Sequence, residues 1–253
     1  MAIKHDFQDL AVLVTGAGRG LGRSVAVKLA SCGATVGLID IDAGTCEAAA
    51  ALISDAGGHA FAYATDVADR SAFAAAAGRF AAERGRIDAV VNNAMLLRYE
   101  PIENVSDEVL DRMLGIGIKG SVWGAQMLLA HMGADRGGAI VNMASPVAER
   151  GYPNTAIYSL VKGAVVTLTR TLAAELGPRR VRVNAVAPGS VPTPGAMGLN
   201  DEAEYARRAR TIPLRRLGRE EDNAEAVAWL LSPEAAFVNG EILHVDGGIA
   251  AAG

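Results

Sequence analysis

Residues 11–30, AVLVTGAGRGLGRSVAVKLA, join a short apolar run, a glycine-rich turn and a segment with helical spacing. The run from Ala11 to Thr15 has the length of a strand, and Val25 and Leu29 follow the turn at helical spacing. Glycines let a backbone approach a phosphate closely, and a helix N-terminus offers unpaired N–H groups with partial positive charge. This stretch therefore predicts a strand, a loop and a helix that together hold the phosphates of a nucleotide.

The glycine spacing is G-x-x-x-G-x-G and not the strict dinucleotide fingerprint G-x-G-x-x-G. Counted from Gly16, the last glycine of that fingerprint would stand at position 21, which is Leu21. A tight strand-to-helix connection that binds nothing would also use such glycines. The position of the loop between a strand and a helix favours nucleotide binding.

Strand-like and helix-like segments alternate along the whole chain. Short apolar or β-branched runs predict strands at residues 11–15, 35–40, 60–65, 89–93, 139–144, 181–186 and 242–245. Longer segments with helical spacing predict helices at residues 20–31, 43–56, 69–84, 107–132, 156–176 and 220–231. Fully apolar strands separated by helices indicate a parallel sheet covered on both faces. We therefore expect an α/β fold in a single domain, a Rossmann-like doubly wound sheet of about seven strands, with ligands beyond the carboxyl ends of the strands.

The composition excludes several classes of function. The 253 residues carry 24 Lys and Arg against 28 Asp and Glu, and this mild acidity argues against a nucleic-acid partner. The arginines of residues 207–219 lie between acidic residues and predict a solvated face of mixed charge. Cys32 and Cys46 are too few for a disulfide framework and lack the spacing of a metal site. We therefore expect no metal. The chain has no membrane-length apolar run, and its first residues, MAIKHDFQDL, do not resemble an export signal, so we expect a cytoplasmic protein.

Asp40 ends the second predicted strand, 18 residues after Gly22. An acid at this point can accept hydrogen bonds from the ribose hydroxyls of an adenosine. It would also repel a 2′-phosphate by about 4 kcal/mol, for unit charges about 4 Å apart at an effective dielectric of about 20. Arg19 is the cation that could offset this repulsion, because Ile41 and Asp42 beside Asp40 carry no positive charge. The sequence therefore predicts NAD rather than NADP. The alternative is that Asp40 caps the next helix, but Asp42 could serve that role instead.

Polar residues also follow the third and fourth predicted strands. Asp66 and Val67 come after the third strand, and Asn92, Asn93 and Ala94 come after the fourth. These residues could contact adenine and ribose, or they could simply form turns.

Tyr158 and Lys162 lie four residues apart at the start of a predicted helix and therefore share one face. A phenol that acts as a base near neutral pH must have its pKa lowered by about 3 units, which an adjacent ammonium and an oxidised nicotinamide could achieve. Ser145 precedes Tyr158 by 13 residues and follows the fifth strand, so its hydroxyl could bind the substrate oxygen that exchanges a proton with Tyr158. The spacing Y-x-x-x-K alone is common, and only the three residues together predict catalysis.

These motifs together resemble the short-chain dehydrogenase/reductase family over essentially the whole chain. Residues 15–22 match its TGxxxGxG, residues 92–94 most of its NNAG, and Tyr158 and Lys162 its YxxxK, with Ser145 as the catalytic serine. Pro188, Gly189, Val191 and Thr193 resemble its PGxVxT segment at the nicotinamide end, and residues 245–248 resemble its VDGG.

The resemblance implies that Ser145 positions the substrate oxygen, that Tyr158 is the general acid/base, and that Lys162 holds the ribose and lowers the pKa of the tyrosine. It also implies a homotetramer or a homodimer. Together with the residues above, it predicts a cofactor site made of Gly16, Arg19, Gly20, Leu21, Asp40, Ile41, Asp66, Val67, Asn93, Ala94, Tyr158, Lys162, Pro188, Gly189, Val191 and Thr193.

Three positions depart from the family pattern. Gly117 stands where the family has a fourth catalytic residue, an asparagine, whose main-chain carbonyl holds a water in a proton relay to the lysine. Gly117 keeps that carbonyl, and Gly115 and Gly117 favour a local break in the helix, so we expect the relay to survive without the amide side chain. Met95 replaces the last glycine of NNAG and either narrows the site or fills a loop core, and Val161 replaces a residue that is often serine.

The residues expected around the substrate are mostly apolar. They are Met95, Leu96, Pro146, Val147, Tyr152 and the segment 191–213, which contains Pro192, Pro194, Gly195, Met197 and Leu199. They predict a neutral secondary alcohol or its ketone, with residues 191–213 as a mobile lid that excludes water. Arg98 and Arg150 leave an anionic substrate as the alternative.

The leading interpretation is an NAD-dependent alcohol dehydrogenase or ketone reductase. An NADPH-linked ketoreductase of a biosynthetic pathway is a second interpretation, against which Asp40 argues. A third is a nucleotide-binding homologue that has lost catalysis, which Gly117 and Met95 suggest and the intact Ser145, Tyr158 and Lys162 oppose.

Overall fold

Seven parallel strands form one sheet in the computed structural model, which describes residues 5–196 and 201–252. The strands are β1 (Ala11–Thr15), β2 (Thr35–Asp40), β3 (His59–Ala64), β4 (Ala89–Asn92), β5 (Gly138–Met143), β6 (Val181–Pro188) and β7 (Ile242–Val245). Their order in the sheet is β3-β2-β1-β4-β5-β6-β7, and each neighbouring pair is parallel. The chain winds outward from β1 to β3 and then, on the other side, from β4 to β7. The predicted Rossmann-like doubly wound sheet is therefore confirmed.

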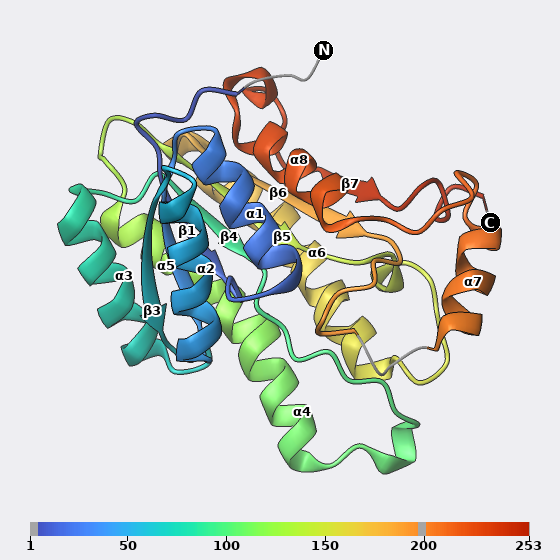
Figure 1. Cartoon of the computed structure of the whole chain (residues 1–253). Coiled ribbons are helices and arrows are strands. Elements are labelled where there is room, and N and C mark those ends of the chain that lie inside the picture. The colour runs from blue at the N-terminus through green and yellow to red at the C-terminus, as the bar shows by residue number, and fades with distance from the viewer. Residues whose placement is uncertain (1–4, 197–200, 253) are drawn as a thin grey trace.

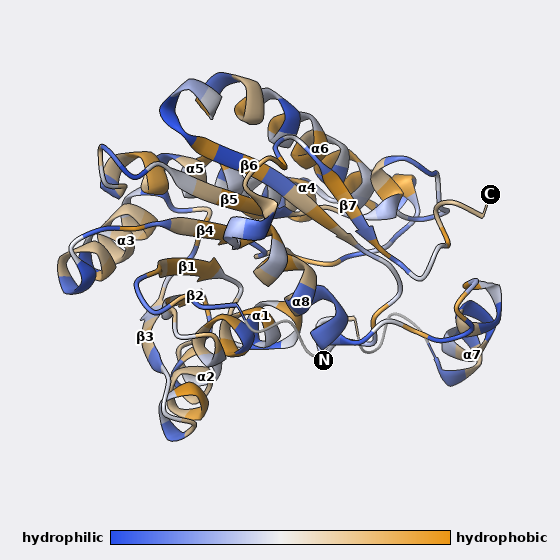
Figure 2. Cartoon of the chain, turned by 90° about the horizontal axis from the view of Figure 1, so that it is seen from above, coloured by the Kyte–Doolittle hydropathy of each residue, from blue (hydrophilic) through white to orange (hydrophobic). Residues whose placement is uncertain are grey.

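Helices cover both faces of this sheet (Figure 1). They are α1 (Gly20–Ser31), α2 (Ala43–Asp55), α3 (Arg70–Arg84), α4 (Asp107–Leu114), α5 (Gly120–His131), α6 (Ala156–Leu176), α7 (Glu202–Thr211) and α8 (Glu220–Leu231). Helices α1, α2 and α8 share one hydrophobic cluster, and α3, α5 and α6 share a second cluster on the opposite face. The view from above shows the same two layers, with α7 apart from them at the edge of the molecule (Figure 2).

The strands contribute alternate residues to the two clusters. Val12 and Val14 of β1 pack on the side of α1, whereas Leu13 between them packs with Phe73 and Phe80 of α3. All five side chains are fully buried. Because successive side chains of a strand point to opposite faces, a strand buried on both sides must be apolar throughout, as the sequence of β1 is.

All seven predicted strands are present, and their ends shift by a few residues at most. Strand β3 begins at His59, and β6 continues to Pro188. The predicted helix at residues 107–132 is instead α4 and α5 joined by a π-helical turn, Gly115–Lys119. The break expected at Gly115 and Gly117 is therefore a single wide π-helical turn, and the backbone remains helical from α4 into α5.

Helix α7 is the one long helix that the sequence did not predict. It contains no buried residue, so its sequence EAEYARRART lacks the apolar stripe on which a helix prediction rests. Local contacts stabilise it instead. The Asp201 carboxylate caps its first turn by accepting a hydrogen bond from the Glu204 N–H at 2.7 Å, and Glu204 forms ion pairs with Arg207 and Arg208.

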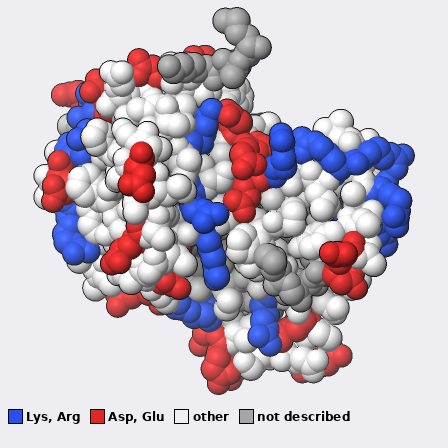
Figure 3. All heavy atoms as spheres, in the orientation of Figure 1, with Lys and Arg blue, Asp and Glu red and all other residues white. Residues whose placement is uncertain are grey.

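Charged side chains of both signs are interspersed over the surface seen in Figure 3, with basic residues gathered around α7. No helix within residues 5–196 or 201–252 has the length and apolar character that a membrane span requires.

Candidate active site

A cavity of about 460 Å³ lies beyond the carboxyl ends of the strands, where the chain connections diverge between β1 and β4. Every residue that the sequence predicts as catalytic or cofactor-binding contributes to its lining. The cavity therefore brings together residues from both halves of the sheet, from Gly16 to Thr193.

The glycine-rich loop between β1 and α1 is fastened to the end of β4. The Asn93 side-chain amide donates hydrogen bonds to the carbonyls of Thr15 at 2.9 Å and Gly16 at 3.1 Å. The Thr15 hydroxyl accepts hydrogen bonds from the N–H groups of Asn93 and Ala94. Gly16 has a φ of +63°, and a β-carbon there would lie 2.9 Å from the Ala94 Cα. Asn93 thus lines the cavity and also holds the loop in shape.

The Asp40 carboxylate lies at the end of β2 and is held by two backbone groups. It accepts hydrogen bonds from the Gly18 N–H at 2.9 Å and from the Asp42 N–H at 3.1 Å. The helix α2 is capped by Asp42, whose carboxylate accepts a hydrogen bond from the Thr45 N–H at 3.0 Å. Asp40 forms no ion pair with any residue in the described part of the chain, and Arg19 beside it is exposed. Asp40 is therefore available to a ligand, and the helix cap is Asp42.

Asp66, after β3, is paired with an arginine that the sequence analysis did not single out. Arg112 of α4 donates a hydrogen bond to the Asp66 carboxylate at 2.5 Å, and the Ala68 N–H donates another at 2.9 Å. Burial alone would raise the pKa of Asp66, but these donors lower it below its usual value. The ion pair fixes both side chains in the wall of the cavity.

Ser145, Tyr158 and Lys162 meet where β5 and α6 lie against each other. Lys162 is 5% exposed, and its ammonium donates a hydrogen bond to the Met143 carbonyl at 2.6 Å. The Lys162 Nζ atom lies 5.6 Å from the centre of the Tyr158 ring. Ser145 is 8% exposed and follows the same strand, so β5 positions both the serine and the carbonyl that holds the lysine.

A buried hydrogen-bond network fixes α6 against β5. The Asn142 amide donates to the Thr169 hydroxyl at 2.9 Å, and Thr169 donates to the Val165 carbonyl at 2.8 Å. The Asn92 amide donates to Asn142 at 2.8 Å and so extends the network to β4. Because buried polar groups left without partners are costly, this network holds the helix in one register.

The pKa of Tyr158 is shifted in the direction opposite to the one expected from the sequence. Burial raises the pKa of the phenol above its usual value, Tyr99 acts in the same direction, and the Ser145 hydroxyl opposes them. Burial also lowers the pKa of Lys162 from 10.5 to about 8. A lysine with this pKa supplies less positive charge to lower the pKa of Tyr158. Its ammonium is also directed at the Met143 carbonyl. In the protein alone, Tyr158 is therefore a protonated phenol at neutral pH.

Two of the three departures from the family pattern, Met95 and Val161, have side chains that lie beside the third, Gly117. A β-carbon on Gly117 would lie 2.3 Å from the Val161 Cγ1 atom and 2.9 Å from the Met95 Sδ atom. Met95 also lines the cavity, so it both narrows the site and fills the space beside Gly117. The Gly117 carbonyl accepts a hydrogen bond from the Ser121 hydroxyl at 2.7 Å.

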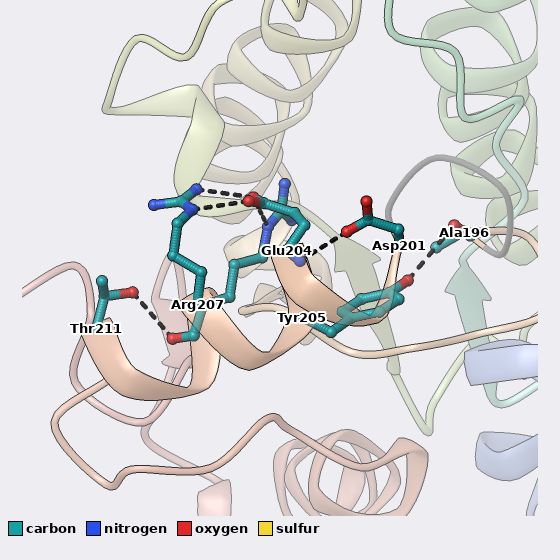
Figure 4. A network of polar contacts seen from close by, with 7 residues as sticks. Ala196, Asp201, Glu204, Tyr205, Arg207 and Thr211 are labelled. Atoms are coloured by element: carbon teal, nitrogen blue, oxygen red, sulfur yellow. Dashed lines mark hydrogen bonds and ion pairs between the residues drawn. The ribbon is translucent and has the colours of Figure 1, made fainter.

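The substrate end of the cavity contains residues that the sequence analysis missed. The Tyr99 ring packs against the Tyr158 ring with centroids 5.5 Å apart and planes at 61°. Helix α7 contributes Tyr205 and Arg208. Figure 4 shows Glu204 of α7 joined to Arg207 by two hydrogen bonds, and the Tyr205 hydroxyl directed to the Ala196 carbonyl. No periodic pattern marks Tyr99, and α7 itself was not predicted.

Several residues predicted near the substrate lie elsewhere. Met95, Leu96, Val191 and Gly195 contribute to the lining. The residues that do not are Pro146, Val147, Tyr152, Pro192 and Pro194. The Arg98 side chain pairs with Glu100 at 3.5 Å, and Arg150 donates a hydrogen bond to the Ile249 carbonyl at 2.7 Å, so neither takes the role of anion receptor at this cavity. Met197 and Leu199 lie outside the described residues.

Known proteins resemble the chain over nearly its full length. Residues 16–250 match a protein family described as Enoyl-(Acyl carrier protein) reductase. The chain is 37% identical to the 2-(S)-hydroxypropyl-CoM dehydrogenase 3 of Xanthobacter autotrophicus, over 98% of this chain and 100% of the relative. It is 39% identical to the cis-4-hydroxycyclohexanecarboxylate dehydrogenase of Sinomonas cyclohexanicum, over 97% of this chain and 98% of that protein.

Solved structures agree with this relationship. A short-chain alcohol dehydrogenase of Sinorhizobium meliloti superposes with a TM-score of 0.93 at 35% identity, covering 98% of this chain and 99% of that chain. A 3-ketoacyl-(acyl-carrier-protein) reductase of Brucella melitensis in complex with NADH superposes with a TM-score of 0.88 at 34% identity, covering 95% and 98%.

Proposed function

Since the chain belongs to the short-chain dehydrogenase/reductase family and is therefore an oxidoreductase that acts on CH–OH groups, we propose that it uses NAD to interconvert a secondary alcohol and its ketone. The observation that carries this proposal is the cavity in which Ser145, Tyr158 and Lys162 lie at one end and the Asp40 carboxylate lies at the other. One end suits a reacting alcohol, and the other suits a ribose.

The residues of the cavity fit a dinucleotide. The glycine-rich loop and the N-terminus of α1 would hold its pyrophosphate, the Asp40 carboxylate would accept hydrogen bonds from the adenosine ribose, and Lys162 would contact the other ribose. Pro188, Gly189, Val191 and Thr193 would hold the nicotinamide end. When bound, NAD supplies the acceptor or donor of a hydride and, in its oxidised form, a positive charge near Tyr158.

Tyr158 would transfer the proton in both directions of the reaction. Its raised pKa keeps the phenol protonated at neutral pH, so it can donate a proton to the oxygen of a ketone as that oxygen becomes an alkoxide. In alcohol oxidation, Tyr158 must first lose its proton, which requires additional positive charge beside it. The Ser145 hydroxyl would bind the same substrate oxygen and orient it.

Asp40 supports NAD over NADP, because its carboxylate is fixed by two N–H groups at the point where a 2′-phosphate would lie. The structural neighbour in complex with NADH is consistent with this choice. An NADPH-linked ketoreductase would need Arg19 to neutralise the phosphate. A homologue that binds the nucleotide without catalysis would not need Ser145, Tyr158 and Lys162 in one cavity.

The wall near Tyr158 suits the apolar body of a substrate, since it includes Met95, Leu96, Leu97 and Ile116. Of the two relatives described above, one is a dehydrogenase of cis-4-hydroxycyclohexanecarboxylate and the other a dehydrogenase of 2-(S)-hydroxypropyl-CoM. Residues 191–213 would act as the lid over this end. We also expect a single domain, a homotetramer or homodimer and a cytoplasmic location.

Absorbance of the reduced nicotinamide tests the proposal directly. The protein is mixed with NAD or NADP and a panel of neutral cyclic and linear secondary alcohols, and the reverse reaction is followed with the ketones. We expect turnover with NAD and at least a tenfold lower kcat/KM with NADP. A preference for NADP would overturn the cofactor proposal, and binding of NAD without turnover of any alcohol or ketone would favour the non-catalytic homologue.

A further inference from the structure

Four basic side chains line the cavity within the described residues, and three of them lie at the cofactor loop or have a partner there. Arg19 lies at the glycine-rich loop, Arg112 is paired with Asp66, and the Lys162 ammonium is bound to the Met143 carbonyl. The fourth is Arg208 of α7, at the substrate end. The proposed reaction assigns it no task.

The charge of Arg208 is only partly neutralised. Glu204 is its ion-pair partner, with the Arg208 Nε atom 2.7 Å from Oε1. The same carboxylate also accepts two hydrogen bonds from Arg207, from Nε and Nη2, both at 2.7 Å. One carboxylate shared by two guanidinium groups leaves one net positive charge on this cluster.

Arg208 is the member of the pair that faces the cavity. Its side chain is 34% exposed, compared with 61% for Arg207, and only Arg208 contributes to the cavity lining. Only the Nε atom of Arg208 has a hydrogen-bond partner among the described residues. Its two terminal nitrogens are therefore available to a ligand, while Glu204 fixes the plane of the guanidinium.

Tyr99 connects Arg208 with the proposed proton donor. The Tyr99 ring packs against Tyr158, and its hydroxyl lies in the field of Arg208, which lowers its pKa against the larger effect of burial. Tyr99, Tyr158 and Arg208 all line the same cavity. A molecule that reaches from Tyr158 to Arg208 within this cavity would meet the Tyr99 side chain as well.

We infer that Arg208, with the Tyr99 hydroxyl, binds a carboxylate that the substrate carries at the end opposite its reacting alcohol. A guanidinium with two free nitrogens matches a carboxylate in geometry and charge, and such hydrogen bonds are about twice as strong as neutral ones. The inference rests on the proposed oxidoreductase function and changes the expected substrate from a neutral alcohol to a hydroxy acid with an apolar body. Glu204 is a positioning residue, because it orients Arg208 without touching the substrate.

Two alcohols that differ only by a carboxylate test the inference. We choose cyclohexanol and 4-hydroxycyclohexanecarboxylate, and the readout is the ratio of kcat/KM for the acid to kcat/KM for the neutral alcohol. Arg208→Gln should lower this ratio about 10- to 100-fold, mainly through KM for the acid, and Arg208→Lys should restore part of it. Arg210→Gln is the matched control, since it removes the same charge from the same helix at an exposed position outside the cavity. It should leave the ratio unchanged.

A binding measurement separates failure of the inference from failure of the proposed function. Cyclohexanecarboxylate, which cannot be oxidised at a hydroxyl, is titrated calorimetrically into the NAD-loaded wild type, Arg208→Gln and Arg210→Gln. Binding that is at least tenfold weaker in Arg208→Gln alone supports the anion site even if neither alcohol is turned over. Equal binding by all three proteins, or an equal loss of kcat/KM for both alcohols in Arg208→Gln, would overturn it.

Discussion

Adding a methyl group at Gly117 should destabilise the protein, although alanine normally stabilises a helix. The new β-carbon would lie 2.3 Å from the Val161 Cγ1 atom and 2.9 Å from the Met95 Sδ atom, well inside van der Waals contact. Met95 is unbranched and can move aside. Val161 is fully buried on α6 and is β-branched, so its side chain has little freedom to turn away.

The magnitude follows from two opposing effects. Overpacking a core typically costs about 1–3 kcal/mol, and the short distance to a stiff side chain places Gly117→Ala near the upper value. Alanine gains about 1 kcal/mol over glycine in a helix. We therefore expect a net loss of about 2 kcal/mol in the free energy of unfolding.

Two glycines provide matched controls for this prediction. A β-carbon at Gly115, in the same π-helical turn, would meet only the Ala68 Cβ at 3.4 Å, and one at Gly78 of α3 would meet nothing within 4 Å. Both alanine variants should be as stable as the wild type or more stable by up to about 1 kcal/mol. The assay is urea unfolding of each variant.

A double-mutant cycle identifies the cause of the loss. Val161→Ala removes the atoms that clash, so the pair Gly117→Ala with Val161→Ala should be more stable than the sum of the single changes predicts, by at least about 1 kcal/mol. The reasoning would be refuted if Gly117→Ala were as stable as Gly115→Ala. It would also be refuted if the effects of Gly117→Ala and Val161→Ala on the free energy of unfolding were strictly additive. The same overlap means that Gly117→Asn reports on the proton relay only if Val161 and Met95 are also made smaller.

Three further predictions concern the cofactor, the buried amine and α7. Asp40→Ser removes a repulsion of about 4 kcal/mol against a 2′-phosphate. The ratio of kcat/KM with NADP to kcat/KM with NAD should therefore rise by up to about 10³-fold. An unchanged ratio would show that Asp40 does not select between the two cofactors. Burial lowers the pKa of Lys162 to about 8 in the folded protein. Between about pH 8 and 10.5, the amine is therefore protonated in the unfolded chain but largely neutral in the folded protein. The free energy of unfolding of the wild type should consequently rise with pH over this range, by at most about 3 kcal/mol. Lys162→Met should lack this gain in urea unfolding at pH 7.5 and 10, and equal pH dependence would contradict it. Glu204→Gln removes the carboxylate shared by Arg207 and Arg208, so amide hydrogen exchange in α7 should accelerate, whereas unchanged exchange would show that these ion pairs do not stabilise the helix.

The sheet and the cofactor end of the site could be predicted because their signals are local. The strands are short, mostly apolar runs, and most of the predicted cofactor residues lie at or just after a strand end in the sequence. The βα units then bring Asp40, Asn93, Ser145 and Thr193 to one edge of the sheet whatever the details of packing.

The substrate end could not be predicted, because its residues carry no periodic or motif signal. Helix α7 is stabilised by a cap and by ion pairs, which leave no apolar stripe in the sequence. The charge pattern therefore assigned Arg208 to a solvated face of mixed charge. The close approach of Val161 and Met95 to Gly117 joins three segments that are distant in the sequence. The upward pKa shift of Tyr158 depends on burial, which spacing alone does not reveal.

The rate of ketone reduction by Tyr158→Phe tests the central claim most directly, because the change removes one oxygen from a ring that still packs against Tyr99. Tyr63→Phe is the control, since Tyr63 is a buried tyrosine of β3 outside the cavity. In single turnovers with excess NADH, we expect Tyr158→Phe to be about 10²- to 10⁴-fold slower than the wild type while NADH affinity stays the same, and Tyr63→Phe to keep the wild-type rate. A Tyr158→Phe rate close to that of the wild type would show that another group transfers the proton.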